Sequence, residues 1–287
     1  MRLILTLLCR NEIDIIESMI RFHLAHGVDF IVATDNGSSD GTRNCLQHYV
    51  KSSKLLLIDQ SESTHDQAVW VTAMARIATE QLGADWLIHS DADEFWWPLD
   101  GDLKTTLQAV PPGVQALTVG RTNFLPPPGN SGQESWESGC FHQRQRLRER
   151  RSLNSMGQPL PGKICHRALA GISISDGNHG AALAGQALDA PKTTAIEILH
   201  FPIRSLEQFS AKISHGAQAL ANNPRLHPQV GATWRQIYNE HVLGGTLGAY
   251  YDSLCLTPRE RERLIQAGRL LNDPRLHDWF EGHSQSL

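Results

Sequence analysis

Hydrophobic runs and helix-like patterns alternate along the first hundred residues. Residues 3–8 form a continuous apolar run, and shorter strand-like segments follow at 29–34, 54–58 and 86–89. Between them, helical patterns cover 13–26, a segment ending at Tyr49, and 66–82. Apolar runs of this kind are typical of interior parallel strands. The pattern therefore predicts an α/β fold, with a Rossmann-like, mainly parallel sheet flanked by helices.

The pattern changes after Pro98. Residues 118–124 indicate another strand and its exit, 126–132 is a loop rich in proline and glycine, and 206–220, 233–251 and 258–271 are helical in pattern. We expect a first domain over 1–205 and a helical C-terminal extension over 206–287 that packs on it.

Polar clusters follow three of the predicted strands. They read CRNE at 9–12, TDNGSSDGT at 34–42 and SDADE at 90–94. In a parallel sheet, ligands bind beyond the carboxyl ends of the strands. The three clusters are therefore expected to meet at one edge of the sheet.

Composition and charge narrow the class of protein. The chain has 287 residues, 40% hydrophobic and 20% charged, which suits a globular protein of one large domain or one domain with an appendage. A formal charge of −4 gives no general attraction to nucleic acid. The 5 cysteines are widely spaced and include no CxxC, which fits reduced thiols in a cytosolic protein.

The first residues, MRLILTLLCRNE, admit two interpretations. The apolar part is short for a signal peptide and lacks a small-residue cleavage site, so we interpret it as a buried first strand. No apolar run of ~18 residues is present, and no spanning helix is expected. We expect a cytoplasmic protein, with peripheral contact at the inner face of the membrane left open.

The acidic cluster is the first candidate site. Asp91 and Asp93 are alternate carboxylates after a strand, and both can turn toward one Mg²⁺ or Mn²⁺ ion. The alternative is a solvated acidic loop or a helix cap. His200 follows an apolar segment and precedes a proline turn. Its neutral imidazole can supply a third ligand, and the alternative is a structural histidine.

The other clusters also carry two interpretations each. Arg10 can meet a phosphate, and Asn11 and Glu12 can contact a nucleoside, although the same residues can cap a helix. Asp35 and Asn36 can face a base edge or form a plain turn. The polar segment 176–180 can supply a base or an acceptor contact, or be a surface turn. The arginine-rich run 144–151 can bind an anion or form a solvated edge strand.

Three of these segments together resemble the glycosyltransferase family 2-like enzymes of GT-A fold. They are LLCRNEIDIIESMIRFHLAHGVD, FIVATDNGSSDGT and DWLIHSDADEFWWP, in that order, and the last two resemble the family's DDGSxDGT loop and DxD motif. The similarity is greatest to the subgroup with DADEF and a later HFPIRS segment followed by a lysine. It covers residues 1–100 well and 163–212 in patches.

The resemblance implies a nucleotide-sugar donor, a UDP-sugar by default, and a divalent metal, Mn²⁺ or Mg²⁺. It implies transfer of the sugar to a hydroxyl of a glycan or lipid-linked acceptor, in bacterial surface polysaccharide assembly. By position, it assigns the nucleoside to Arg10, Asn11, Glu12, Asp35, Asn36 and Asp66, the metal to Asp91 and Asp93, and the metal or diphosphate site to His200. Lys163, Arg204 or Lys212 can add positive charge at the diphosphate. The family's usual carboxylate base has no clean match here, and Asp176, His179 and Glu137 are the candidates.

Two other classes stay open. A nucleotidyltransferase also combines a nucleotide fold with acidic metal ligands, but it usually has a glycine-rich loop after the first strand, and CRNE contains no glycine. A non-catalytic carbohydrate- or partner-binding module of the same fold is the other class. The intact DxD and CRNE segments argue against it.

Overall fold

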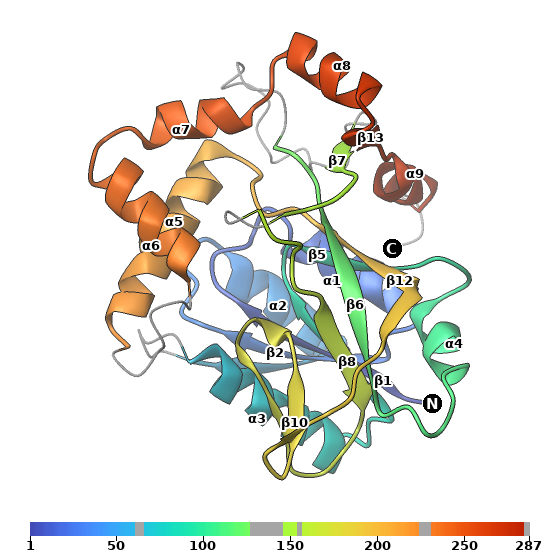
Figure 1. Ribbon diagram of the computed structural model, residues 1–287. Helices are drawn as coiled ribbons and strands as arrows, with labels where there is room; N and C mark the ends of the chain where they lie inside the picture. The colour runs from blue at the N-terminus through green and yellow to red at the C-terminus, as the bar shows by residue number, and fades with distance from the viewer. Residues whose placement is uncertain (61–65, 127–145, 154–156, 224–230, 284–287) are drawn as a thin grey trace. The chain divides into compact units, whose positions relative to one another are not determined.

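A parallel half-sheet forms from the first four apolar runs. The computed structural model describes residues 1–60, 66–126, 146–153, 157–223 and 231–283 (Figure 1). Strands β1 (Leu3–Cys9), β2 (Phe30–Asp35), β3 (Leu55–Asp59) and β4 (Trp86–Asp91) lie in the order β3-β2-β1-β4. Each neighbouring pair is parallel. Their side chains are largely buried on both faces, as the continuous apolar runs require.

Four further strands extend this half into one eight-stranded sheet. The order continues with β8 (Lys163–Arg167), β6 (Ala116–Asn123), β12 (Lys192–His200) and β5 (Glu94–Pro98). Strand β8 runs antiparallel to both β4 and β6. The predicted α/β class with a parallel, helix-flanked sheet is confirmed, and the antiparallel insertion of β8 is an addition that the apolar pattern does not show.

Helices α1 (Ile16–Ala25), α2 (Thr42–Lys51), α3 (Gln67–Glu80) and α4 (Leu103–Gln108) accompany the sheet. Helix α3 buries Val71, Met74 and Ala75 in the same core as Ile4 of β1 and Leu87 of β4. Burying such side chains is the main favourable contribution to folding, about 25 cal/mol for each Å² of apolar surface. The packing holds the start of α3 beside the end of β4.

A small three-stranded sheet packs against α3. Its strands are β9 (Ile172–Ile174), β10 (Ala181–Leu183) and β11 (Gln186–Ala187), and the short helix η3 (Asp176–Asn178) connects β9 to β10. The main-chain N–H of Ile174 donates to Thr72 Oγ1 of α3 at 2.9 Å. This contact fixes the segment that carries η3.

The C-terminal helices are α5 (Leu206–Ala221), α6 (Ala232–Ile237), the π-helical turn η4 (Tyr238–Val242), α7 (Leu247–Leu254), α8 (Pro258–Gln266) and α9 (Arg275–Gly282). The helical character of this region is confirmed, but the single helix predicted for 233–251 is wrong. Gly244 and Gly245 separate η4 from α7, and Gly245 has a φ of +67°. The helix predicted for 258–271 ends at Gln266, and 270–272 instead forms strand β13 (Leu270–Asn272).

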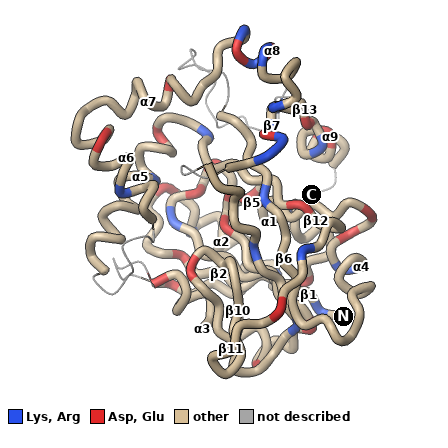
Figure 2. The backbone as a smooth tube through the Cα atoms, viewed as in Figure 1, with Lys and Arg blue, Asp and Glu red and all other residues tan. Residues whose placement is uncertain are grey.

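The arginine-rich run contributes a short strand, and Arg150 and Arg151 after it are exposed. Strand β7 (Leu147–Glu149) pairs antiparallel with β13, and Figure 2 shows the basic positions along it. Arg148 forms an ion pair with Asp273 at 2.7 Å, and the Arg146 guanidinium lies over the Phe201 ring. These arginines therefore have structural partners. Residues 144 and 145 lie outside the described residues.

The chain groups into two compact units. The first comprises 1–121 and 160–199 and contains most of the eight-stranded sheet, and the second comprises 122–159 and 200–287. Residues 122–159 thus group with the C-terminal helices, although the sequence pattern places them in the first domain. In the second unit, Phe209, Ile213, Ile237 and Tyr251 form a separate core.

Candidate functional site

Strand register brings the predicted polar clusters to one edge of the sheet. Asp91 of β4 pairs with Leu8 of β1, and the next residue, Cys9, pairs with Asp35 of β2. Asp35 in turn pairs with Asp59 of β3. The expected convergence of the strand ends is confirmed for these positions.

The CRNE segment is tied to the loop after β2. Asn11 has a φ of +55°, accepts a hydrogen bond from Ser39 N at 2.8 Å through Oδ1, and donates its N–H to Ser38 Oγ at 2.9 Å. The N–H of Glu12 donates to Thr42 Oγ1 at 2.8 Å. Asn11 therefore orders the loop at this edge. Arg10, which stands between Cys9 and Asn11, is exposed.

Asp35 is the deepest polar group of this loop. Its side chain is 1% exposed, and Oδ2 accepts from Ser38 N at 3.1 Å. Its Oδ1 is buried and has no hydrogen-bond partner. A buried carboxylate oxygen without a partner is costly, and most buried polar atoms have one. The N–H of the next residue, Asn36, donates to Cys9 O at 2.9 Å.

Asp91 is the meeting point of three segments. Lys163 Nζ, at the start of β8, donates to Asp91 Oδ2 at 2.5 Å. Gln67 Nε2 at the start of α3 lies 3.4 Å from Asp91 Oδ1, and Asn178 Nδ2 of η3 lies 3.5 Å from the same oxygen. Burial favours protonation of Asp91, but the Lys163 ammonium outweighs it and keeps the pKa below its usual value.

Glu94 is the fully buried member of the charged cluster. It accepts from the N–H of Asp91 at 3.2 Å, and lies 3.2 Å from Arg121 Nη1 and 3.3 Å from Lys163 Nζ. Burial raises the pKa of Glu94 to about 7, against the opposing effect of Lys163. Asp93 is also buried, at 2% exposure, whereas the Asp91 side chain is 34% exposed. Of these carboxylates, Asp91 is therefore the one open to a ligand.

The polar segment 176–180 reaches this cluster through a residue that the sequence did not single out. Asn178 is 2% exposed, has a φ of +58°, and its Oδ1 is buried without a partner. The N–H of Gly177 donates to Gln67 Oε1 at 3.1 Å. Asn178, Gln67 and Arg121 were missed because their position depends on long-range packing. The only available signal was that Asn178 lies inside DGNH and Gln67 next to Asp66.

Two of the candidate bases belong to this segment and make different contacts. Asp176 Oδ1 accepts the N–H of Ala68 at 3.2 Å, so it caps the start of α3. His179 is exposed and its Nδ1 lies 2.8 Å from Gly162 O, which makes Nδ1 the donor and leaves the lone pair on Nε2. Glu137, the third candidate, lies outside the described residues. Asp66 is the residue before α3, and its carbonyl accepts from Trp70 N.

The remaining predicted residues belong to the second unit. His200 Nδ1 lies 2.7 Å from Asn123 Oδ1. Arg204 is fully buried, and its Nη1 donates to Phe201 O at 3.4 Å. Lys212 lies within α5 and is partly exposed.

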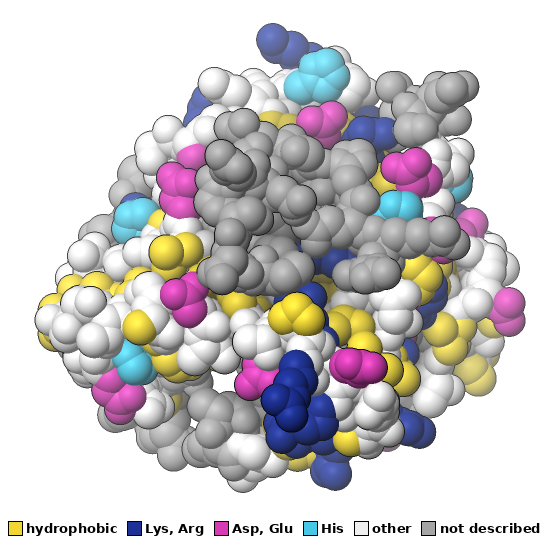
Figure 3. All heavy atoms as spheres, turned by 90° about the horizontal axis from the view of Figure 1, so that it is seen from above, with side chains coloured by type: hydrophobic (Ala, Val, Ile, Leu, Met, Phe, Trp, Pro, Cys, Tyr) yellow, Lys and Arg dark blue, Asp and Glu magenta, His cyan; other side chains and the backbone are white. Residues whose placement is uncertain are grey.

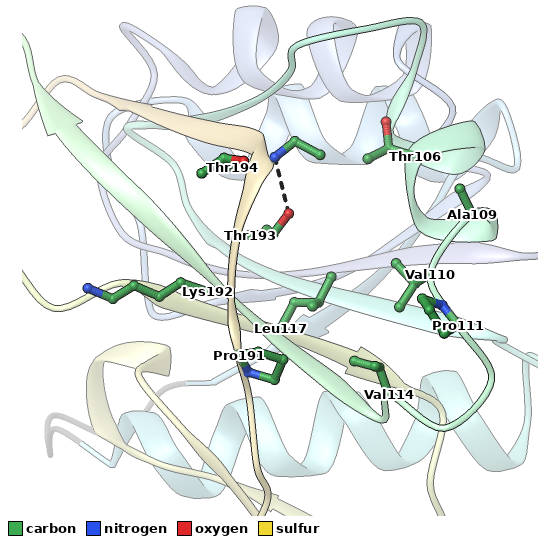
Figure 4. Close-up of a pocket in the computed structure, with 11 residues that line it drawn as sticks. Thr106, Ala109, Val110, Pro111, Val114, Leu117, Pro191, Lys192, Thr193 and Thr194 are labelled. Carbon is green, nitrogen blue, oxygen red and sulfur yellow. Dashed lines mark hydrogen bonds between the residues drawn. The ribbon is translucent and has the colours of Figure 1, made fainter.

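A separate open pocket lies at the other end of the sheet. It has a volume of ≈ 390 Å³ and is lined by small and apolar residues, among them Val110, Val114 and Leu117 (Figure 4). Because β6 and β4 both run antiparallel to β8, the start of β6 lies level with the start of β4, away from Asp91. The pocket is therefore not part of the strand-end site.

Two wider properties bear on ligands and surroundings. Within the described ranges, no three His, Cys, Asp or Glu side chains come together as a metal-binding group. No helix in the part of the chain that the structure describes is long and apolar enough to cross a membrane. On the face seen in Figure 3, acidic side chains adjoin the basic ones, so the visible described surface shows no broad area of one sign.

Comparisons with known proteins give distant likenesses only. No protein-family model matches the chain, and no curated protein matches it. Among solved structures, it is similar to S. aureus TarS 1-349 at 11% identity and a TM-score of 0.42, covering 93% of this chain and 79% of that one. It is also similar to the mannosyltransferase PcManGT from Pyrobaculum calidifontis in complex with GDP-Man and Mn²⁺, at 20% identity and a TM-score of 0.34, covering 41% and 35%.

A third similarity is to glucosyl-3-phosphoglycerate synthase from Mycobacterium tuberculosis in complex with Mn²⁺ and UDP. There the identity is 18%, the TM-score is 0.30, and the match covers 42% of this chain and 44% of that one. The chain thus spans less than half the length of that enzyme and of the mannosyltransferase. The α/β class rests on the sheet and helices themselves.

Proposed function

We propose that this protein is a glycosyltransferase that moves a sugar from a nucleotide-diphosphate sugar to an acceptor hydroxyl. One observation carries the proposal. At a single sheet edge, a buried carboxylate with an unpartnered oxygen, Asp35, stands two strands from a partly exposed carboxylate, Asp91, that is paired with a lysine. Such an edge offers an acceptor for a base N–H at one end and charge control for a diphosphate at the other.

The nucleoside would lie over the ends of β1 and β2. Asp35 Oδ1 would accept from the base, with Asn36 beside it, and this bond would satisfy the buried oxygen. Arg10 is exposed at the same edge and would meet phosphate. Asn11 and Glu12 would shape the pocket wall, and Asp66 would contact the nucleoside from the start of α3.

The residues at the end of β4 fit a divalent metal. Asp91 offers a partly exposed carboxylate, and the buried Asn178 Oδ1 beside it is an oxygen without a partner. Mg²⁺ and Mn²⁺ prefer such oxygen ligands, with the rest of the coordination supplied by phosphates and water. Asp91 would hold the metal, and Asp93 and His200 stay candidate ligands from the sequence. When bound, the metal would supply positive charge to the departing diphosphate.

Side chains of the protein would bind the diphosphate and accept the proton of the acceptor hydroxyl. The Lys163 ammonium is paired with Asp91 and Glu94, and of its three N–H groups one would donate to a diphosphate oxygen. Arg204 and Lys212 stay candidate diphosphate residues from the sequence. His179 suits the base better than Asp176, because its Nδ1 is engaged by Gly162 O and its Nε2 carries the lone pair, while the Asp176 carboxylate is engaged by Ala68. Glu137 stays a candidate base from sequence.

The setting follows from the resemblance alone. A UDP-sugar is the default donor, and a glycan or lipid-linked molecule in bacterial surface polysaccharide assembly is the proposed acceptor. Peripheral membrane contact at the cytoplasmic face is part of the same proposal.

Thermal stability with a panel of nucleoside diphosphates, with and without Mn²⁺, tests the donor site. A specific binder at one hundred times its dissociation constant stabilises the folded state by about 2.7 kcal/mol. We expect a Mn²⁺-dependent rise in melting temperature for one nucleotide. Asp91→Ala should abolish both this rise and sugar transfer, while the variant without ligand keeps a cooperative melting transition.

The outcomes separate the competing classes. No shift with any nucleotide would favour a non-catalytic binding module. Release of pyrophosphate from a nucleoside triphosphate would favour a nucleotidyltransferase. Full transfer activity in Asp91→Ala and Asp93→Ala would contradict the metal assignment.

A further inference from the structure

Lys163 occupies an unusual position for a ligand-binding lysine. Its side chain is 1% exposed, and it is held between two carboxylates, with Nζ 2.5 Å from Asp91 Oδ2 and 3.3 Å from Glu94 Oε1. A buried ammonium needs such partners because burial disfavours its charge. In the protein without ligand, Lys163 therefore already neutralises the carboxylate that is open to a metal.

The charges of the cluster are nearly balanced without a metal. Asp91, Asp93 and Glu94 carry three negative charges when ionised, and Lys163 and Arg121 carry two positive charges. The net charge is then −1, or 0 when Glu94 is protonated, and a divalent cation would change it to +1 or +2. That cation would have to share Asp91 with an ammonium nitrogen only 2.5 Å from the carboxylate oxygen. The cation and the ammonium would then flank one carboxylate, and like charges in a buried site repel each other strongly.

A second, independent observation indicates that the site is nevertheless built for a ligand. Asn178 is 2% exposed and touches Asp91 through Nδ2, yet its Oδ1 is buried without a hydrogen-bond partner. Native proteins seldom leave such an atom unsatisfied. The site therefore combines an unused oxygen ligand with a carboxylate that is already neutralised.

We propose that Lys163 is a resident counter-ion that keeps the divalent-cation affinity of this site low until a diphosphate arrives. The two or three negative charges of a nucleoside diphosphate restore the balance and give the ammonium a second anion. Cation and diphosphate then bind as a pair rather than independently. This inference rests on the proposed function, since it concerns the same site.

The test measures Mn²⁺ binding rather than activity. Protein-bound Mn²⁺ is followed by water-proton relaxation, with UDP and GDP as probes and protein-free nucleotide blanks. We expect the wild type to bind Mn²⁺ at least tenfold more tightly when UDP or GDP is present. In Lys163→Met, Mn²⁺ should bind at least tenfold more tightly than in the wild type without nucleotide, and the added gain from nucleotide should shrink.

A matched control exists in the same unit. Lys104 forms an ion pair of the same length, 2.5 Å, with Asp29 near the opposite end of the sheet. Lys104→Met removes a lysine from an aspartate without touching the site, so its Mn²⁺ affinities should equal those of the wild type. If Lys163→Met does not fold, Lys163→Gln keeps an N–H for Asp91 and replaces it in the test.

The contradicting results are distinct. If the wild type binds Mn²⁺ equally well with and without nucleotide, or a folded Lys163 variant keeps the wild-type affinity, the counter-ion role is wrong while the donor site stands. If Mn²⁺ binds in no sample at all, both the metal site and this inference fail.

Discussion

Asp35 and Asp59 occupy the same register position on neighbouring strands, but their environments are opposite. Asp59 is 58% exposed and forms an ion pair with Arg43 at 2.7 Å. Asp35 is 1% exposed, and one of its oxygens has no partner. The residue type is the same, so the difference lies in what surrounds each carboxylate. The folded protein does not satisfy one oxygen of Asp35, and unsatisfied groups of this kind are typical of residues that bind a ligand.

Asp35→Asn separates ligand binding from stability. The amide removes the buried charge and keeps an oxygen for Ser38 N, so we expect the melting temperature of the ligand-free protein to be unchanged or higher. The affinity for the nucleoside diphosphate should fall at least tenfold, because the amide offers a donor where the base requires an acceptor. Calorimetric titration measures the affinity.

Asp59→Asn is the matched control for this substitution. It removes an exposed ion pair, which contributes about 0–1 kcal/mol, and it should leave nucleotide affinity intact. Equal affinities in the two variants would contradict a nucleoside role for Asp35.

At the scale of elements, η3 depends on a glycine. Gly177 has a φ of +68°, and a Cβ built there would lie 2.5 Å from His179 Nε2. Only glycine allows both this backbone conformation and the close approach of the imidazole ring. This conformation places Asn178 beside Asp91, and it lets the N–H of Gly177 donate to Gln67 Oε1.

Gly177→Ala should disturb this turn and therefore the site. We expect destabilisation of about 1–3 kcal/mol in urea unfolding and a loss of Mn²⁺ affinity in the presence of nucleotide. Gly171→Ala is the control, because Gly171 also has a positive φ, +77°, but a Cβ there meets nothing within 4 Å. That variant should share the backbone strain and keep the Mn²⁺ affinity. Retained affinity in Gly177→Ala would show that η3 does not hold the site.

The same elements show how far sequence reasoning reaches. Strands that are buried on both faces consist of continuous apolar runs, so such runs predict β1 to β4. The pairing of these strands then places Asp35 and Asp91 at one edge of the sheet. The partners of Asp91 were not predictable as a set. Lys163 is 72 residues away and Asn178 is 87 residues away, and no local pattern records which distant segment pairs with β4. The same reason explains the missed break at Gly244, where tertiary packing decides between one helix and two.

At the scale of the whole molecule, buried histidines control the response to acid. Thr6 Oγ1 donates to His89 Nδ1 at 2.6 Å, His89 Nε2 donates to His166 Nε2 at 2.8 Å, and His166 Nδ1 donates to Arg167 O at 2.7 Å. The carbonyl of Arg167 fixes these directions, because it can only accept. All four ring nitrogens of His89 and His166 have a hydrogen-bond partner of the right kind only when both rings are neutral.

Burial lowers the pKa of His166 to about 4, and it lowers the pKa of His89 well below its usual value. Burial also lowers the pKa of His23 to about 3. The unfolded chain therefore binds more protons than the folded one below pH ~6.5, and stability falls as the pH decreases from there to about 4. Glu94, with its pKa raised to about 7, has the opposite effect, but three histidines outweigh one carboxyl.

We expect the free energy of unfolding to fall by several kcal/mol between pH 6.5 and 4, of which His166 alone contributes roughly 3 kcal/mol. Urea unfolding at pH 7, 6, 5 and 4.5 measures this dependence. His166→Leu should be less stable at pH 7 and show a shallower decline, because one titrating group is gone. A decline as steep as that of the wild type would contradict the role of this histidine.

The antiparallel insertion of β8 also sets an order of events during synthesis. The parallel half-sheet is complete in sequence by Asp91, but the ammonium that pairs with this carboxylate arrives 72 residues later. Until Lys163 has left the ribosome and β8 has joined β4, Glu94 has no lysine beside it and the edge of β4 is open. Long-range pairings of this kind slow folding and leave strand edges exposed. The strand that begins with the lysine that balances the site is thus also the one that covers the edge of β4.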